Sequence, residues 1–292
     1  MRNKIRNIFL ELLKSRGFNL HRTPSPYHLS LDYPVSTRPR YTKSKPHSGI
    51  ENSIIANCAA YEMELAEITR RTDLFATIGA DASDTYSPNW MNEWLHALDA
   101  AALMHFLLKH KPARYTEIGS GNSTKFARRA VEFGRLSTTI TSIDPHPRAE
   151  INNICDHVIR KPLEQTSLSF FDDLCPGDIL FFDGSHRVFM NSDVIVFFLE
   201  VIPRLKPGVL IHVHDIFWPA DYPPEWGERY YSEQYMLGML LLFGPYRTVL
   251  PNAFIANDRQ LSGALDVLPK SLNRWPTSYW ITSLPADSVG GL

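Results

Sequence analysis

Strand-like segments that alternate with helix-like segments constrain this chain more than any other feature. We predict strands near Arg114–Ile118, Thr139–Ile143, His157–Arg160, Ile179–Asp183 and Val209–His214. Helix-like segments near residues 123–133, 167–174 and 193–205 separate them. One run, Ile179–Phe182, is continuously apolar, as expected of a strand that is buried on both faces. This βα alternation predicts an α/β fold with a mostly parallel sheet.

Further elements are predicted on both sides of this core. Helices are expected over Glu51–Arg71, Asn89–Lys111 and Ser232–Phe243, and strands over Tyr246–Ala256 and Ser278–Ser283. Residues 1–18 have apolar side chains at helical spacing and predict an amphipathic helix rather than a secretory signal. Residues 22–49 carry five prolines and three tyrosines with little periodicity, which predicts an extended arm or linker.

Composition excludes several classes of protein. The 292 residues have a net charge of −1, so whole-chain charge favours neither nucleic acid nor a membrane as a partner. Three cysteines without metal-ligand spacing predict neither zinc nor disulfides, and they suit a reducing, cytoplasmic setting. The longest apolar run, Met236–Phe243, is far shorter than the ~20 residues of a membrane span. We therefore expect a soluble protein, as a monomer or a homo-oligomer.

A glycine pair follows the first predicted strand. Glu117 stands two places before Gly119 and Gly121, and a helix-like segment comes next. A strand that runs into Gly-x-Gly and then into a helix is typical of a cradle for a nucleotide-like cofactor. Acidic residues, Asp144 and Asp183, end two later strands. Because ligands of open α/β sheets bind over the carboxyl ends of the strands, we expect these residues to line one site.

The residue types favour S-adenosylmethionine (SAM) over a dinucleotide. A dinucleotide presents a pyrophosphate, which GxGxxG and a helix N-terminus serve, but here Thr124 occupies the third glycine position. SAM has no phosphate and carries an ammonium and a sulfonium, which carboxylates attract. Glu117 beside the glycine turn would repel a pyrophosphate. Asp144 accepts hydrogen bonds from ribose hydroxyls in either case and does not discriminate.

The sequence resembles the class I SAM-dependent methyltransferases, in particular a small-molecule branch with E-x-G-S-G-N-S-T and D-G-S-H motifs. The residues that carry the resemblance are Glu117–Thr124, Ile143–Pro145, Phe181–His186 and Leu205–Ile216. It covers roughly Trp90–Ser283, which predicts a methyltransferase domain over residues 90–292 after a helical and proline-rich extension over residues 1–89. It implies a Rossmann-like, doubly wound seven-stranded sheet of order 3-2-1-4-5-7-6 with the last strand antiparallel.

The resemblance also implies the roles of the cofactor-binding residues. Glu117 and the glycine loop, with Gly119, Ser120, Gly121, Asn122 and Thr124, would hold the methionyl part of SAM. Asp144 would hold the ribose, and Asp183 would stand beside the methyl donor.

Two mechanisms remain open for the transfer itself. If the fourth and fifth strands are neighbours, Asp183 and His186 meet His214 and Asp215 at their carboxyl ends. In the first mechanism, which we favour, His186 or His214 is the general base and Asp183 assists it. In the second, Asp183, His214 and Asp215 bind a divalent metal ion that lowers the pKa of the acceptor hydroxyl. A histidine in that set departs from the oxygen ligands that Mg²⁺ prefers.

Two segments beside this cluster have weaker signals. His212 lies within an apolar strand and is interpreted as a core residue. The aromatic and proline-rich segment Phe217–Tyr231 suits either a lid over an apolar acceptor or a self-packed surface loop.

The predicted function is thus a SAM-dependent methyltransferase that acts on a small molecule, most plausibly at a hydroxyl oxygen. The alternatives are an NAD(P)-dependent oxidoreductase and a non-catalytic SAM-binding scaffold. The DPPY-type tetrad of base-amine methylation is absent, because Asp183–His186 occupies its place.

Overall fold

The computed structural model describes residues 11–13, 15–16 and 34–284. Most of the amphipathic helix predicted over residues 1–18, and the first part of the predicted arm, lie outside the described residues. The chain forms two compact units, Met1–Ser36 and Thr37–Leu292. Residues 37–89 pack within the larger unit, whereas a functional division at residue 89 stays a prediction.

The larger unit is built on a seven-stranded sheet of order β3-β2-β1-β4-β5-β7-β6. Its strands are β1 (Arg114–Ile118), β2 (Thr139–Ile143), β3 (His157–Ile159), β4 (Ile179–Phe182), β5 (Leu210–Val213), β6 (Tyr246–Pro251) and β7 (Tyr279–Ser283). The pairs within β3-β2-β1-β4-β5 are all parallel. Strand β7 is antiparallel to both β5 and β6. The predicted fold class and strand order are confirmed.

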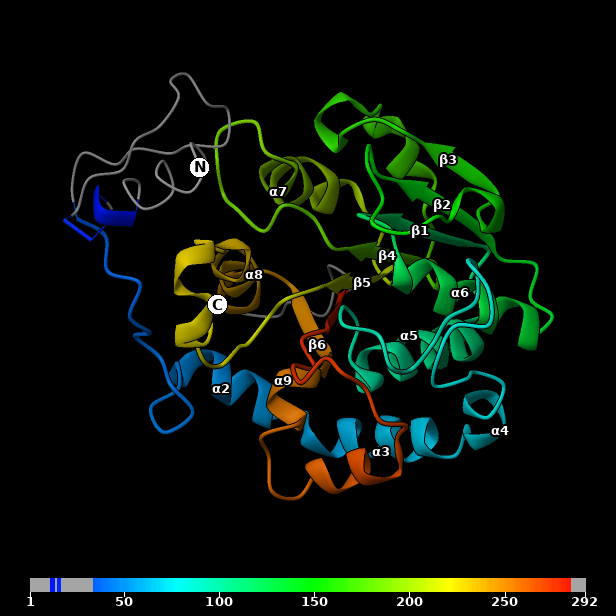
Figure 1. Cartoon of the computed structure of the whole chain (residues 1–292), viewed down its shortest axis with the longest axis horizontal. Coiled ribbons are helices and arrows are strands. Elements are labelled where there is room, and N and C mark those ends of the chain that lie inside the picture. The colour runs from blue at the N-terminus through cyan, green and yellow to red at the C-terminus, as the bar shows by residue number, and fades with distance from the viewer. Residues whose placement is uncertain (1–10, 14, 17–33, 285–292) are drawn as a thin grey trace, which may run out of the picture. The chain divides into compact units, whose positions relative to one another are not determined.

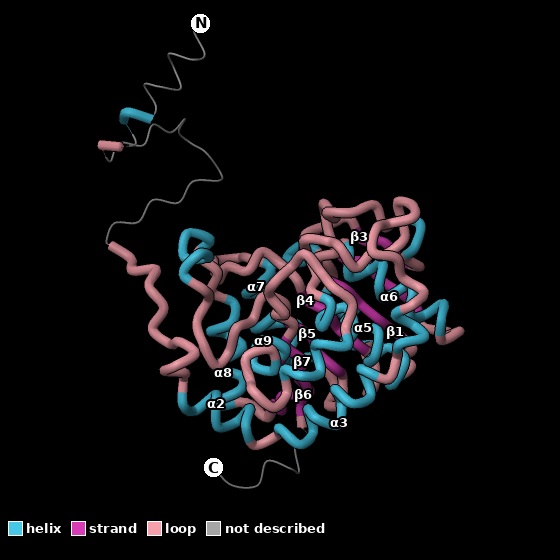
Figure 2. Tube along the Cα trace, turned by 60° about the horizontal axis from the view of Figure 1, so that its bottom comes forward, coloured by secondary structure: helices cyan, strands magenta, loops and turns pink. Residues whose placement is uncertain are grey.

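Helices cover both faces of the sheet. Figure 1 shows α5 (Ala97–His110) and α6 (Asn122–Phe133) on one side, with α7 (Asp193–Val196) and α8 (Glu233–Phe243) on the other. Figure 2 shows the same strands running through the centre between the helices. The remaining α-helices are α2 (Ser48–Ile55), α3 (Cys58–Thr69), α4 (Thr72–Phe75) and α9 (Asn252–Ile255). No helix among the described residues is long and apolar enough to cross a membrane.

Shorter turns of 3-10 or π-helix complete the connections. The 3-10 segments are η1 (Asn152–Ile154), η2 (Leu163–Gln165), η3 (Leu168–Asp173), η5 (Ile202–Arg204), η6 (Pro224–Arg229) and η7 (Ser262–Val267). The helix predicted near residues 193–205 is α7 followed by a π-helical turn, η4 (Phe197–Val201), and then by η5.

Local hydrogen bonds explain where the predicted helices differ from the observed ones. The helix predicted over Asn89–Lys111 begins only at Ala97. The Asn92 side chain accepts from the N–H of Leu95 ahead of the helix, and the His96 side chain caps the helix by accepting from the N–H of Leu98 in its first turn. The helix predicted over Glu51–Arg71 divides into α2 and α3 at residues 56–57.

The strand predicted over Tyr246–Ala256 was too long. It ends at Pro251, and α9 follows. The backbone N–H of Asn252 donates to the carbonyl of Ser278, and its buried amide donates to Asp99. These two contacts turn the chain away from the sheet.

The arm at residues 37–47 packs against the loop that follows β5. Backbone N–H groups of Arg40 and Tyr41 donate to the Asp221 carboxylate, at 2.6 and 2.9 Å. The N–H of His47 donates to the carbonyl of Pro219 at 2.9 Å. The rings of Tyr41 and His47 also contact that of Trp218. Residues 37–47 and the loop that follows β5 therefore hold each other in place.

Candidate active site

The two glycines of the turn after β1, Gly119 and Gly121, have different structural roles. Gly119 has a φ of 78°, and a Cβ there would lie 1.7 Å from the carbonyl oxygen of Asp183. It is therefore required by the close approach of the β1 and β4 ends. A Cβ on Gly121 would meet only the Cβ of Arg148, at 3.9 Å. Gly121 therefore leaves room beside the turn, as a ligand cradle needs.

Glu117 is buried behind this turn. Its carboxylate accepts from the Tyr115 hydroxyl at 3.2 Å and from the Thr124 hydroxyl. The Thr124 hydroxyl in turn accepts from the N–H of Gly121 at 3.1 Å. Burial, outweighing these hydrogen bonds, raises the pKa of Glu117 to about 8. Glu117 thus fixes the glycine turn from behind, and it is not among the residues that line the two cavities over the strand ends.

Asp144 fixes the turn from the other side. One carboxylate oxygen accepts from the N–H of Ser120 and the other from the N–H of His146, both at 2.7 Å. The Ser120 hydroxyl is bonded to that of Ser142 at 2.8 Å. The ends of β1 and β2 are therefore joined at the position predicted to hold a ribose.

Two cavities open over these strand ends. The first has a volume of about 400 Å³ and is lined by Ile118–Ser120, Ile143–His146, Arg148, Pro162–Glu164, Asp183–Ser185, Ser192 and Asp193. The second has a volume of about 110 Å³ and is lined by Trp94, Leu95, Ser120–Ser123, Arg148, Ala149, Phe181, Asp183 and His214. Asp183 lines both cavities and so stands where they meet.

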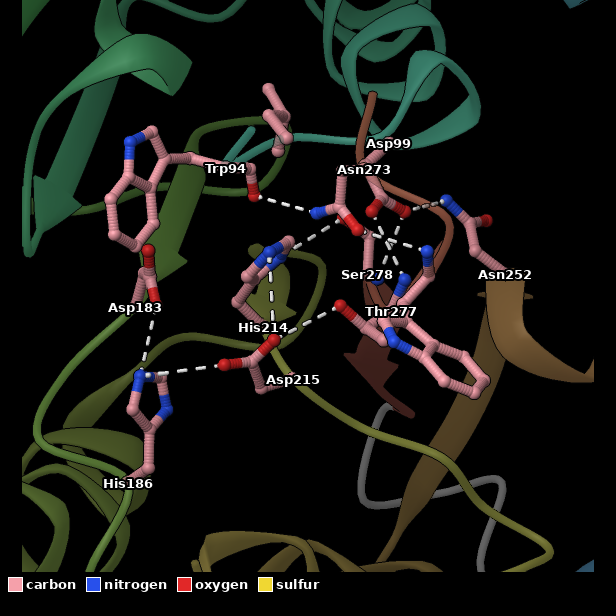
Figure 3. A network of polar contacts seen from close by, with 12 residues as sticks. Trp94, Asp99, Asp183, His186, His214, Asp215, Asn252, Asn273, Thr277 and Ser278 are labelled. Carbon is pink, nitrogen blue, oxygen red and sulfur yellow. Dashed lines mark hydrogen bonds and ion pairs between the residues drawn. The ribbon is translucent and has the colours of Figure 1, made fainter. Parts of the chain in front are cut away.

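A cluster of charged side chains lies beside Asp183 (Figure 3). His186 Nε2 is 3.4 Å from Asp183 Oδ1 and 3.6 Å from Asp215 Oδ2. His186 Nδ1 is 2.5 Å from Oε1 of Glu233, which is fully buried at the start of α8. His186 and Asp215 both have positive φ, 65° and 56°. This costly backbone conformation in two non-glycine residues is typical of functional sites.

The pKa of His186 decides which histidine can accept a proton. Burial lowers this pKa, but the carboxylates of Glu233, Asp215 and Asp183 outweigh burial and raise it to about 10. His186 is therefore protonated at neutral pH and is a cation among three acids.

His214 occupies a different position, facing the second cavity. Its Nε2 is 3.9 Å from Asp215 Oδ1, and its Nδ1 is 3.5 Å from the Ser278 hydroxyl. Burial lowers the pKa of His214, but Asp183 and Asp215 outweigh burial and raise it above its usual value.

His212, on the same strand, belongs to the core. Its ring stacks on Phe181 at 3.6 Å and its Nε2 is bonded to Ser278 at 2.8 Å. Burial lowers its pKa well below the usual range, so it is neutral.

Asp99 of α5 holds this half of the site in place, as Figure 3 shows. Its buried carboxylate accepts from the N–H groups of Thr277 and Ser278 at 3.0 Å and from the amide of Asn252 at 2.7 Å. The Thr277 hydroxyl donates to Asp215 at 3.2 Å. The start of β7 therefore positions both Asp215 and His214.

The residues suited to a metal ion differ from the predicted set. Ligand atoms of Asp183, His186 and Asp215 lie within 4.8 Å of one another. Thus the structure gathers His186, rather than the predicted His214, with the two aspartates. One imidazole and two carboxylates suit a transition metal. The bond from His186 Nδ1 to a buried carboxylate is the arrangement that orients metal-ligating histidines.

Some residues of the site were missed from the sequence. Glu233 is an isolated acid at the start of an apolar helix, which was a usable signal. Trp94, Asp99 and Arg148 gave none, because their positions depend on contacts between distant segments.

Comparison with known proteins bears on the same region. Residues 116–216, roughly a third of the chain, match the family model described as "Methyltransferase domain". The sequence matches no curated protein. Because the match runs from β1 to the end of β5, and the strand order agrees, the fold is the Rossmann-like fold of methyltransferases.

Several solved structures have a similar chain course. An O-methyltransferase from Bacillus cereus in complex with SAH is 13% identical, with a TM-score of 0.41, and the match covers 81% of this chain and 91% of that chain. SAH-bound PaMTH1 from Podospora anserina is 14% identical, with a TM-score of 0.42 and coverage of 80% and 96%. The mycinamycin-pathway methyltransferase MycE, in complex with Mg, SAH and mycinamycin VI, is 16% identical, with a TM-score of 0.39 and coverage of 69% and 53%.

The buried carboxyl of Glu117 makes stability depend on pH. A folded-state pKa near 8, above the unfolded value, means that the folded chain holds this proton more tightly. The stabilisation that comes from this tightly held proton is complete below about pH 4.5 and is lost as the pH rises through about 8.

We expect the unfolding free energy, measured by urea denaturation, to fall between pH 5 and 8 more in the wild type than in Glu117→Gln. Exposed Glu132→Gln is the control and should follow the wild type. If the unfolding free energy changed equally with pH in the wild type and in Glu117→Gln, the raised pKa of Glu117 would be contradicted.

Proposed function

We propose that this protein is a SAM-dependent methyltransferase that acts on a hydroxyl oxygen of a small molecule. The observation that carries the proposal is the charge of the larger cavity. Four carboxylates line it (Asp144, Glu164, Asp183 and Asp193), against one guanidinium, that of Arg148. Such a lining attracts a cationic ligand and repels a pyrophosphate, which disfavours a nicotinamide dinucleotide.

The shape of the site suits SAM as well. The volume of about 400 Å³ lies in the range of small-molecule sites, and Gly121 leaves room at the turn. In this proposal Asp144 binds the ribose, and the glycine turn with Ser120 and Asn122 binds the methionyl part. Bound SAM supplies a methyl group on a sulfonium.

We assign His214 as the general base that accepts the proton of the acceptor hydroxyl. It lines the second cavity together with Asp183. Its raised pKa suits a base that must hold a proton once it has accepted one. His186 is already protonated at neutral pH and so cannot act as the base. Its positive charge instead balances those of Asp183 and Asp215.

A divalent metal ion is the second candidate for activating the hydroxyl. Asp183, His186 and Asp215 would hold it, and Glu233 would orient His186. When bound, such an ion lowers the pKa of a nearby hydroxyl.

Calorimetry tests the cofactor. Purified protein should release or absorb heat with SAM and not with NAD⁺ or NADP⁺. Asp144→Ala should weaken SAM binding by about 10-fold or more, because it removes the ribose acceptor. Tight binding of a nicotinamide dinucleotide without binding of SAM would overturn the proposal.

The base is tested by turnover. His214→Gln should lower kcat by ~10²-fold or more, because general-base assistance is lost, while the Kd for SAM stays within a few-fold. His157→Gln, on the exposed face of β3, is the matched control and should keep full activity. Wild-type turnover in His214→Gln would remove His214 from the mechanism. Binding of SAM without turnover on any hydroxyl acceptor would favour a non-catalytic role.

Metal removal tests the second candidate. If an ion is used, dialysis against a chelator should abolish turnover, and Mn²⁺ should restore it in the wild type but not in Asp215→Asn. Unchanged turnover after chelation, with no heat on titration of Mn²⁺, would exclude the ion.

A further inference from the structure

Arg148 is placed unlike any other cation of the site. It lies on the loop after β2 and lines both cavities. Among the described residues that line them, it is the sole Lys or Arg, and it forms no ion pair with a described carboxylate. Its backbone N–H donates to the carbonyl of Ser120 at 3.4 Å, so the loop is held over the glycine turn. An exposed guanidinium between acid-lined cavities is free to bind an anion.

Trp94 supports this guanidinium. The centre of the guanidinium lies 4.7 Å from the centroid of the indole, within cation–π distance. The backbone of Trp94 is fixed on both sides: its N–H donates to the Asn92 side chain, and its carbonyl accepts from the Asn273 amide. The side chain itself is 57% exposed, although it is a large apolar group. A rigidly held and exposed indole on the rim of a cavity is typical of a binding surface rather than of core packing.

The chemistry of the methyl donor matches this pair. SAM has a single anionic group, the carboxylate at its methionyl end. The acids of the site would repel that carboxylate unless a cation stood beside it. The methionyl end is assigned to the glycine turn, and Arg148 lies against Gly121 of that turn. A guanidinium binds a carboxylate through two parallel hydrogen bonds, which also fixes its orientation.

We infer that Arg148, held in position by Trp94, binds the methionyl carboxylate of SAM. This inference rests on the proposed function, since it assigns a group of the same donor. It makes Arg148 a determinant of donor specificity: the site selects donors that keep the carboxylate.

The test compares SAM with decarboxylated SAM, which lacks only the carboxylate, by calorimetry on the full chain. The variants are Arg148→Met, Arg148→Lys and, as a matched control on an exposed loop, Arg259→Met. Arg148→Met should weaken SAM binding by about 10- to 100-fold, the loss expected for a charge-assisted hydrogen bond. It should change the affinity for decarboxylated SAM by less than about two-fold. Arg148→Lys should fall between the wild type and Arg148→Met, and Arg259→Met should behave as the wild type.

Trp94 is tested with the same two ligands. Trp94→Ala should weaken SAM binding selectively, and Trp94→Phe should restore most of it, because phenylalanine still offers a ring face to the guanidinium. Thermal melting of each variant establishes that it is folded.

The outcomes separate this inference from the function on which it rests. If the wild type binds neither donor, the proposed function is wrong and the inference falls with it. If the wild type binds SAM and Arg148→Met binds it equally well, or if Arg148→Met weakens both donors equally, the carboxylate assignment alone is overturned. Equal weakening of both donors by Trp94→Ala would place the indole against the adenosine instead.

Discussion

The site depends on the contact between the backbones that leave β1 and β4. Gly119 lies so close to the carbonyl of Asp183 that no side chain fits between them. The N–H of Asp183 also donates to the carbonyl of Ile118 at 2.8 Å. The two strand ends are therefore one unit, with the glycine turn on one side and Asp183 on the other. Because Asp183 lines both cavities, this contact fixes the position of the two cavities relative to each other.

Charge balance shapes the cluster around His186. Three carboxylates surround His186, and Glu233 is fully buried. A buried carboxylate is costly unless it is paired, so the imidazolium is what allows Glu233 to lie there. His214, by contrast, lines the second cavity together with Asp183 and has no contact with Glu233 among the described ion pairs. The two histidines thus serve different purposes although they look alike in the sequence.

The sequence predicted the sheet well and the detailed site less well, for physical reasons. Strands β1 and β2 were predicted to the residue, because each is rich in β-branched or aromatic residues and is followed by a glycine or Asp-Pro turn. An isolated acid at the start of an apolar helix marked Glu233 as unusual, but the sequence did not show its partner, because His186 lies 47 residues away. The same holds for Arg148 and Trp94, which meet only through the folded loop after β2. The metal-compatible set contains His186 instead of the predicted His214. This arrangement depends on the positive φ of His186 and Asp215, which the residue types did not indicate.

The arm at residues 37–47 has a consequence for the mobility of the loop that follows β5. Its hydrogen bonds to Pro219 and Asp221 attach it to that loop. The loop cannot swing outward without breaking those bonds and separating the contacting rings of Tyr41, His47 and Trp218. Any large movement of this loop therefore requires the release of a segment that lies some 180 residues earlier in the chain.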